Sequence, residues 1–469
     1  MSGAGEGAGR FAPLMVAVVA VIVLAGMLFG YDQGVISGAL SGIKSTFNLG
    51  PTLIEIVTSW VTLGALVGSL IGGELADRIG RKKAVLTAGA LFTLGALTQA
   101  LAPHPLLLVG GRLVIGVGVG LAAVAAPLYG AEMAPASWRG RFVSAYQLAI
   151  TIGIFLAYQV DASLTANDGG WRLMLGVSAV AGIGLFLAML IAPESPRWLL
   201  KVGRREEALV EYRAVRPGVE HEARIAAMEA SLREEAHKAS WGEVFDPRWR
   251  RPLTIAVGLA IYQQITGINA IIYYADSIFA AAGFASPAAQ TEATTWAIGA
   301  VNVLATFIAI AYIDRLGRRP LLLVGLVGMG ASLVAVGFAF LSIGAGGGKS
   351  AAGIVTLIGL IVFIVSFAFS LGPVVWTVIN EIFPGRVRGR AVAVATAVNW
   401  GAAFIVSRFF LTLVNAIGQS ATFWLFAFFC VTGWVWVWRR VPETKGRSLE
   451  QIDEAWREAG DLAPAVEPV

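Results

Sequence analysis

Long apolar segments recur along the whole chain, separated by short polar connections and by Pro/Gly breaks. A helix needs roughly 20 mostly apolar residues to cross the hydrocarbon core of a bilayer. About twelve segments reach that length. They span residues 14–41, 52–76, 84–103, 106–131, 142–164, 172–192, 252–281, 293–313, 320–343, 353–382, 391–415 and 421–438. The pattern predicts a chain that crosses a lipid bilayer many times.

The composition supports this prediction, with 57% hydrophobic and 14% charged residues, and it excludes an ordinary soluble domain. In lipid every backbone group must find an internal partner, so only helices and closed barrels span a membrane. Continuous apolar runs favour helices over the alternating strands of a barrel. The first run is too long for a signal peptide and lacks an obvious small-residue cleavage site, so it is interpreted as a retained helix. We therefore expect an all-α membrane protein.

The basic residues predict the orientation. Most of the 35 Lys and Arg residues fall in short loops on one side if both termini are cytoplasmic, as the positive-inside rule requires. Lys44, Arg172 and Lys349 fall on the other side, and Arg112 and Arg408 lie within helices. The net charge of +5 is thus explained by basic residues in short loops next to the membrane. We expect a multi-pass cell-membrane protein in contact with the lipid bilayer and without a nucleic-acid partner.

Three motifs of the first half of the chain return in the same order in the second half. They are "DRIGRKK" (77–83) and "DRLGRRP" (314–320), "EMAPASWRGR" (132–141) and "EIFPGRVRGR" (381–390), and "PESPR" (193–197) and "PETKG" (442–446). Each motif follows the corresponding apolar segment of its half. The repetition predicts a duplicated six-helix unit, an arrangement that suits a transporter whose halves rock about a central site.

These repeats divide the chain into four parts. We expect a six-helix half at 1–197, a cytoplasmic linker at 198–250, a second six-helix half at 251–441 and a cytoplasmic tail at 442–469. In the linker, "REEALVEYRAV" and "HEARIAAMEASLREEAHK" are separated by a Pro-Gly pair and predict short amphipathic helices. A solvated linker is preferred to a regulatory domain.

The full set of motifs resembles the sugar porter family of the major facilitator superfamily. The resemblance is carried along nearly the whole chain by "GYDQGVISGAL", "GGELADRIGRKK", "GRLVIGVGVG", "PLYGAEMAPASWRGR", "PESPRWL", "QQITGINAIIYYA", "DRLGRRP", "GPVVWTVINEIFP" and "PETKG". It implies the twelve-helix major facilitator fold and transport of a monosaccharide by alternating access. It also implies a protein that functions as a monomer.

A polar cluster on the seventh predicted helix suits a sugar. A neutral, hydroxyl-rich ring needs groups that both donate and accept hydrogen bonds, and an aromatic face. Gln263, Gln264, Asn269 and Tyr273 supply such groups, and Gly267 allows the helix to bend where family members break it.

The resemblance adds contacts on other predicted helices. These candidates are Gln147, Asn302, Trp376 and Asn399, with Phe29 and Trp400 as walls of the pocket. The alternative is that the amides only join helices to one another, and that the aromatic side chains only pack.

Two of the candidate positions bear on the choice of sugar. Bacterial xylose symporters of the family have glutamines at the positions of Ile154 and Asn399, whereas glucose transporters resemble this chain there. The resemblance therefore favours a hexose over a pentose.

Repeated charges between the helices resemble the family's gating network on the cytoplasmic side. The network residues are Asp77, Arg81, Glu132, Arg139, Arg141, Glu194, Asp314, Arg318, Glu381, Arg388, Arg390 and Glu443. The resemblance implies that they tie the two halves together when the cavity faces outward. The positive-inside rule alone explains the basic members but not the repeated acids.

Asp32 is a carboxylate inside an otherwise uncharged membrane segment. Such residues are costly unless paired or hydrated, and they usually mark a proton, ion or substrate path. Arg112 is the best cationic partner, and its following Gly-rich run, "GVGVG", allows close approach of another helix. Arginine stays protonated, so in such a pair only the aspartate changes charge near neutral pH.

This chemistry makes Asp32 a candidate proton switch. The family resemblance supports that interpretation, because its proton-coupled members resemble this chain in having the matching Asp and Arg. A static salt bridge is the alternative. Glu55, Glu74 and Asp276 are interpreted as helix-end groups, and the sequence offers no account of Arg408.

We therefore predict a proton-coupled importer of a hexose such as glucose, with a monosaccharide and protons as partners. The runner-up is a uniporter, followed by a pentose or polyol symporter. A sugar sensor would need a longer cytoplasmic extension than this tail. A membrane enzyme would need a nucleophile, a metal cluster or an acid–base pair near the pocket, and the sequence shows no such group. The single Cys430 excludes a disulfide framework and a multi-cysteine metal site. No metal or cofactor is expected.

Overall fold

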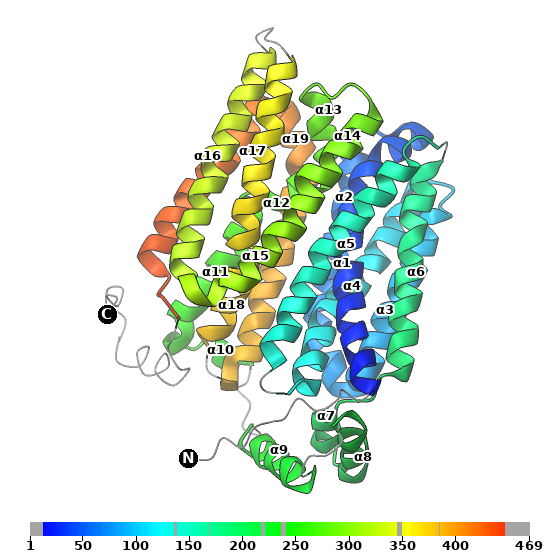
Figure 1. Cartoon of the computed structure of the whole chain (residues 1–469), viewed down its shortest axis with the longest axis vertical. Helices are drawn as coiled ribbons and strands as arrows, with labels where there is room; N and C mark the ends of the chain where they lie inside the picture. Colours follow the sequence, from blue (N-terminus) through cyan, green and yellow to red (C-terminus); the bar gives the residue numbers. More distant parts are fainter. Residues whose placement is uncertain are drawn as a thin grey trace.

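The computed structural model describes residues 13–135, 138–167, 169–216, 221–235, 241–344, 349–383 and 385–445. Throughout these ranges the regular structure is helical. Two bundles stand side by side, and small helices lie beneath the first bundle (Figure 1). We call the end that carries these small helices the linker face, and the other end the opposite face.

The first bundle contains α1 (Pro13–Phe47), α2 (Pro51–Ile79), α3 (Arg81–Ala100), α4 (Pro105–Met133), α5 (Arg139–Leu164) and α6 (Gly170–Ile191). The linker contains α7 (Pro196–Lys201), α8 (Arg205–Val215), α9 (His221–Glu235) and α10 (Trp241–Val244), followed by the 3-10 turn η2 (Pro247–Trp249). Helices occur at both positions expected from the sequence, as α8 and α9, and residues 236–238 of the second expected segment lie outside the described residues. The two helices lie next to each other below the first bundle (Figure 1).

The second bundle has more interrupted helices. It contains α11 (Arg250–Ile265), α12 (Ile268–Tyr273), α13 (Ala275–Ala281), α14 (Pro287–Thr294), the π-helical turn η3 (Thr295–Ala300), α15 (Val301–Leu316), α16 (Arg318–Gly344), α17 (Lys349–Phe369), α18 (Pro373–Glu381) and α19 (Gly385–Arg440).

The predicted spans map onto these helices. The seventh span is α11 to α13, broken at Gly267, which has the left-handed φ of 98° that glycine tolerates. The last two spans form α19, which leaves helical geometry at Gly418. Ten helices in the described ranges are long and apolar enough to cross a membrane, and one of them is the stretch Val387–Arg440 that contains this break. The prediction of an all-α membrane fold is confirmed.

Glycines bring α4 and α2 unusually close. A Cβ on Gly116 would lie 2.2 Å from the carbonyl oxygen of Val61, and one on Gly120 would lie 2.2 Å from that of Ala65. Because real Cβ atoms do not approach that closely, only glycine fits here. This confirms that the "GVGVG" run allows another helix to approach, and it fixes the depth of Arg112 against α2.

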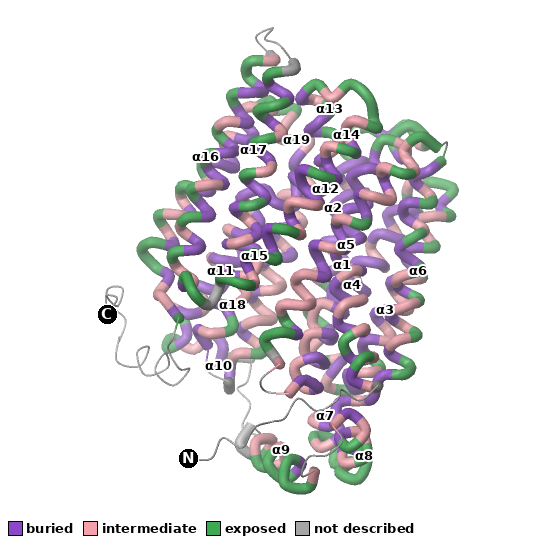
Figure 2. The backbone as a smooth tube through the Cα atoms, viewed as in Figure 1, coloured by how far each residue is buried: buried purple, intermediate pink, exposed green. Residues whose placement is uncertain are grey.

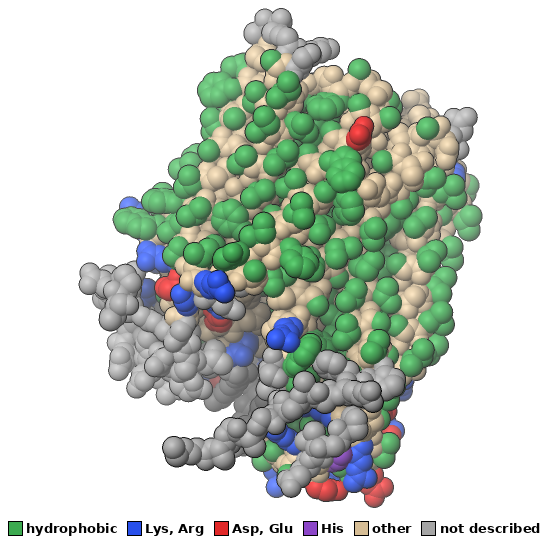
Figure 3. All heavy atoms as spheres, in the orientation of Figure 1, with side chains coloured by type: hydrophobic (Ala, Val, Ile, Leu, Met, Phe, Trp, Pro, Cys, Tyr) green, Lys and Arg blue, Asp and Glu red, His purple; other side chains and the backbone are tan. Residues whose placement is uncertain are grey.

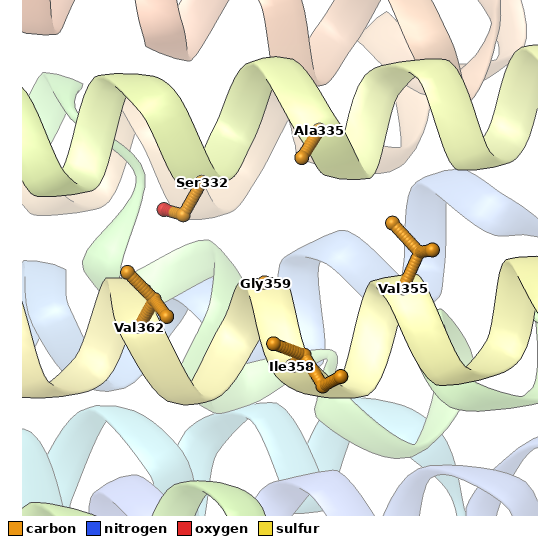
Figure 4. Close-up of a pocket in the computed structure, with 6 residues that line it drawn as sticks. All are labelled: Ser332, Ala335, Val355, Ile358, Gly359 and Val362. Atoms are coloured by element: carbon orange, nitrogen blue, oxygen red, sulfur yellow. The ribbon is translucent and has the colours of Figure 1, made fainter.

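The flanks of both bundles suit lipid. Buried residues face the interior of the bundles, while exposed positions lie on their outer sides (Figure 2). Hydrophobic side chains cover the visible flank, whereas most of the visible charged side chains gather near the linker face (Figure 3). A groove of about 200 Å³ lies between α16 and α17 (Figure 4). Its lining is apolar except for Ser332, so it does not suit a sugar.

Candidate functional site

Asp32 of α1 and Arg112 of α4 form a buried ion pair within the first bundle. Arg112 Nη1 lies 2.8 Å from Asp32 Oδ1, and the two side chains are 0% and 4% exposed. Arg112 Nε donates a second hydrogen bond, of 3.1 Å, to the carbonyl oxygen of Val57 in α2. Its Nη2 is buried without a hydrogen-bond partner among the described atoms. The structure therefore joins the two predicted residues, and the arginine depends on this one carboxylate for its charge partner.

Four amides form a connected network in the second bundle. Gln264 donates to Asn399 at 3.2 Å and accepts from Asn269 at 2.8 Å. Asn399 donates to Gln263 at 2.8 Å, and Gln263 donates to the carbonyl oxygen of Leu371 at 2.7 Å. All four amides are buried. Such a cluster can exchange its internal hydrogen bonds for those of a neutral, hydroxyl-rich ligand.

The break at Gly267 builds this network. It ends α11 just after Gln263 and Gln264, and α12 then begins with Asn269 in its first turn. A Cβ on Gly267 would lie 2.6 Å from the ring of Phe426, so the chain turns against a neighbouring helix. The sequence-predicted bend therefore gathers amides from two helical pieces.

The remaining sugar-site candidates lie on elements of both bundles, in α1, α5, α12, α15, α18 and α19. The rings of Phe29 and Trp400 come from different bundles and meet at a centroid distance of 5.4 Å. Tyr273 lies at the end of α12 and is fully buried. Among the described residues, no hydrogen bond links the amide network to the last group of candidates, which are Gln147 and Ile154 in α5, Asn302 in α15 and Trp376 in α18.

The linker-face charges form a ring within the first bundle. Arg81 donates to both carboxylate oxygens of Glu132, at 2.8 and 2.9 Å, and pairs with Asp77 at 3.0 Å. The Ser195 hydroxyl donates to the same Glu132 carboxylate.

The second bundle repeats this ring. Arg318 donates to Glu381 at 2.9 and 3.3 Å, and the Thr444 hydroxyl donates to Glu381 at 2.6 Å. Each of these contacts lies within one bundle. That the network ties the two halves together stays a prediction.

Glu194 and Glu443 take equivalent positions at the starts of α3 and α16. Glu194 accepts from the backbone nitrogen of Lys82 at 3.0 Å, and Glu443 accepts from that of Arg318 at 3.0 Å. Before each helix stands a glycine, with φ of 98° at Gly80 and 88° at Gly317. Burial raises the pKa of the Glu194 carboxyl above its ordinary value, and the backbone hydrogen bonds oppose that rise.

The other predicted network residues make separate contacts or are placed only by their helix. Arg388 donates to the Phe383 carbonyl oxygen at 3.0 Å, and the exposed Arg141 guanidinium stacks on Trp138 at 4.4 Å. Arg390 lies in α19 and is half-buried. The side chains of Arg139 and Asp314 lie outside what the structure describes.

The opposite face carries hydrogen bonds between the bundles. The Tyr158 hydroxyl of α5 donates to the Ile272 carbonyl oxygen of α12 at 3.0 Å, and the Thr295 hydroxyl of η3 donates to the Tyr158 carbonyl oxygen at 3.1 Å. The backbone nitrogen of Asp276 donates to the Ser37 hydroxyl of α1 at 3.1 Å. These bonds hold the two bundles together at that face.

Sequence reasoning missed Asp161, which lies beside this seam. It is 1% exposed, and its Oδ2 accepts from the Gly38 backbone nitrogen at 3.2 Å. The only available signal was an acid inside a predicted span.

One interpretation of an acidic residue needs correction. Glu55 is more than a helix-end group, because it is 0% exposed and pairs with Arg408 of the other bundle at 2.7 Å. That pair also accounts for Arg408. Asp276 lies in the first turn of α13, as interpreted, and its carboxylate accepts from the Thr294 hydroxyl. Glu74 agrees with the interpretation, since it is exposed and pairs with Arg78 one turn later.

Comparisons with known proteins place the chain in a family. The profile of the family described as "Sugar (and other) transporter" matches residues 18–456. The chain is 39% identical over 416 residues to a D-xylose transporter of Levilactobacillus brevis, covering 87% of this chain and 89% of that one. It is 40% identical over 412 residues to the glucose transporter GlcP of Staphylococcus epidermidis, covering 87% and 90%. An arabinose-proton symporter of Bacillus subtilis is 34% identical over 417 residues, covering 87% and 88%.

Solved structures give the same answer. The inward-open conformation of the xylose transporter XylE from E. coli superposes with a TM-score of 0.81 at 30% identity, covering 94% of this chain and 100% of that one. The proton:xylose symporter XylE bound to 6-bromo-6-deoxy-D-glucose gives a TM-score of 0.78 at 30% identity, covering 94% and 99%. These relatives are transporters and not enzymes. The chain belongs to the sugar porter family of the major facilitator superfamily and is a multi-pass membrane sugar transporter.

Proposed function

We propose that this protein is a proton-coupled sugar symporter that imports a hexose by alternating access. The observation that carries the proposal is the buried Asp32–Arg112 pair. A carboxylate in this position is the one member of the pair that can change charge near neutral pH. Relatives named for proton symport, of arabinose in one case and of xylose in another, support coupling to protons.

Protonation of Asp32 would act through its partner. A neutral carboxylic acid leaves Arg112 as a buried charge without a counter-ion, and breaking such a pair costs about 3–5 kcal/mol. The arginine already holds only one further hydrogen bond, to Val57. The bundle therefore gains by moving to a conformation in which water reaches the arginine. Proton binding would in this way favour reorientation of the carrier.

The amide network is proposed to bind the sugar. Gln263, Gln264, Asn269 and Asn399 offer both donors and acceptors, and their internal hydrogen bonds can be exchanged for sugar hydroxyls at little net cost. The aromatic pair Phe29–Trp400 would cover the apolar face of the ring. The relatives are named for xylose, arabinose and glucose, so they support a sugar as the substrate, and the choice of a hexose is the more specific part of the proposal.

The orientation belongs to the same proposal. The linker face would be cytoplasmic, together with both termini, because the charged side chains gather there (Figure 3). The opposite face, with its closed seam, would then be extracellular. An impermeant thiol reagent applied to intact cells should label a cysteine introduced at the exposed Leu101, but not one introduced at the exposed Val210 of α8.

Proteoliposome uptake tests the proposed function. Purified protein is reconstituted, and a panel of radiolabelled hexoses, pentoses and polyols is offered with and without an inward proton gradient. A symporter concentrates its substrate only with the gradient. Equal uptake under both conditions would instead support the second candidate, a sugar uniporter, and accumulation of a pentose alone would contradict the hexose assignment.

A further inference from the structure

Glu55 is a fully buried carboxylate whose partners come from the other bundle. It lies in the first turns of α2, near the opposite face, and is 0% exposed. Arg408 Nη1 donates to its Oε2 at 2.7 Å, and the Thr412 hydroxyl donates to the same oxygen at 2.8 Å. The Thr412 backbone nitrogen donates to Oε1 at 2.6 Å. Both oxygens are thus held by α19.

These contacts cannot survive separation of the bundles at this face. Glu55 belongs to the first bundle, whereas Arg408 and Thr412 belong to the second. A charge that stays buried after losing its partner is strongly unfavourable. Opening must therefore break all three hydrogen bonds together and hydrate both charges. The contact is therefore either fully formed or fully broken. We call Glu55, Arg408 and Thr412 together the latch.

On its first-bundle side, the latch adjoins the proposed proton switch. Arg112 donates to the carbonyl oxygen of Val57, two residues after Glu55 in α2. The glycine contacts described above pack α4 tightly on α2, so α2 cannot move without α4. A change in the pairing of Arg112 therefore acts on the same turns of α2 that carry Glu55.

On its second-bundle side, the latch adjoins the proposed sugar site. The Tyr274 hydroxyl donates to the carbonyl oxygen of Ser407 at 3.0 Å, and its ring stacks on Phe410 at 4.9 Å. Tyr274 follows Tyr273 at the end of α12, the helix that carries Asn269. The turn of α19 that contains Arg408 is thus braced by the helix that contributes to the amide network.

We propose that Glu55, Arg408 and Thr412 form an ionic latch that holds the opposite face closed and that couples this closure to the charge state of Asp32. The proposal rests on alternating access as the proposed function. The three residues are positioning residues, because none of them belongs to the proposed sugar site or to the Asp32–Arg112 pair.

A thiol reporter in the closed seam tests the latch. Ser37 is 2% exposed and bonds across the bundles, so a cysteine in its place becomes accessible when they part. All variants carry Ser37→Cys and Cys430→Ser, and the purified full chain is held in nanodiscs. Arg408→Met should raise the labelling rate by a water-soluble maleimide about tenfold or more, equivalent to about 1.4 kcal/mol. Glu74→Gln is the matched control, because its ion pair in the same helix is exposed and lies within one bundle.

A second variant guards against loss of folding. Arg408→Met leaves Glu55 as an unpaired buried charge, whereas Glu55→Gln/Arg408→Met removes both charges. Faster labelling of the folded double variant supports the latch. A rate within about twofold of the control in both variants overturns it, since that is the scale expected of an exposed pair.

Coupling to Asp32 is tested by a double-mutant cycle. Asp32→Asn should raise the labelling rate in the parent, and should raise it much less once Arg408→Met has opened the latch. Equal factors in the two backgrounds would overturn the coupling, because independent sites are additive. Labelling needs neither sugar nor a gradient. A parent that transports no sugar but responds to Arg408→Met would therefore refute the proposed function and leave the latch intact.

Discussion

The two bundles share their linker-face contacts but differ in their buried polar groups. Arg81–Glu132 with Ser195 in the first bundle has the same arrangement as Arg318–Glu381 with Thr444 in the second. In the membrane interior the first bundle instead holds a charged pair, and the second holds a network of neutral amides. The contacts proposed to act in movement are thus present in both bundles, whereas the groups proposed to bind ligands differ between them.

The divergence follows the chemistry of the proposed ligands. A proton needs a group whose charge can change, and a carboxylate beside an arginine supplies it. A sugar needs donors and acceptors that remain neutral, and glutamine and asparagine supply them. If these groups bind the proton and the sugar as proposed, their placement in different bundles would let relative movement of the bundles connect the two sites.

The largest effect is expected when the charge of Asp32 in the first bundle is removed. Coupled one to one, a potential of about 100 mV contributes roughly 2.3 kcal/mol and one pH unit about 1.4 kcal/mol. The sum would permit accumulation of roughly 500-fold. Asp32→Asn is permanently neutral, so it should bind sugar and exchange it but never concentrate it. Gradient-driven uptake beside counterflow in proteoliposomes measures both properties.

The outcome separates three possibilities. Accumulation by Asp32→Asn equal to that of the parent would remove Asp32 from proton coupling. Loss of counterflow as well as accumulation would indicate a structural role for the pair. The response of the parent to the gradient is the internal control.

A smaller effect is expected from substitutions in the amide network of the second bundle. Gln264→Ala or Asn269→Ala leaves a buried sugar hydroxyl unpaired, at a cost of about 1–3 kcal/mol, or roughly five- to 150-fold in apparent affinity. Calorimetry on detergent-solubilised protein measures this loss. Gln290→Ala is a suitable control, because that amide bonds to the Phe284 carbonyl oxygen outside the network. Unchanged glucose affinity in both network variants would contradict the proposed binding surface.

Much of this arrangement could be predicted from the sequence. The apolar segments gave the helices, and Gly267 gave the break that gathers Gln264 and Asn269. Asp32 and Arg112 were paired correctly because few charges lie deep in the first half of the chain. In each case the signal is local, or the candidates are few.

The latch could not be predicted in the same way. Glu55 and Arg408 are separated by 353 positions, and their meeting depends on how deep α2 and α19 lie relative to each other. That relative depth is set by packing between two bundles and leaves no local pattern. Glu55 near a helix start was therefore interpreted as an end group, and Arg408 was left without a partner. Two isolated charges in apolar helices were nevertheless a signal that each needed the other.

A shift of the conformational equilibrium tests whether the duplicated rings act between the bundles. Glu132→Gln or Glu381→Gln should weaken the predicted clamp at the linker face and favour conformations closed at the opposite face. With the Ser37→Cys reporter in a Cys430→Ser background, labelling should fall about tenfold if the clamp contributes about 1.4 kcal/mol. Unchanged or faster labelling in both variants would confine the rings to their own bundles.

The smallest expected effect distinguishes the two rings by their burial. The Arg81 and Glu132 side chains are 6% and 7% exposed, whereas those of Arg318 and Glu381 are 11% and 29% exposed. A hydrogen bond to a buried charge contributes about 1.5–3 kcal/mol, and an exposed ion pair contributes about 0–1 kcal/mol. Glu132→Gln should therefore destabilise the protein by about 1 kcal/mol more than Glu381→Gln, a difference of about 2–4 °C in melting temperature for a half of this size. Scanning fluorimetry of the two variants in the same detergent measures it, with Glu74→Gln as the exposed control. If Glu381→Gln melted lower than Glu132→Gln, burial would not be what distinguishes the two rings.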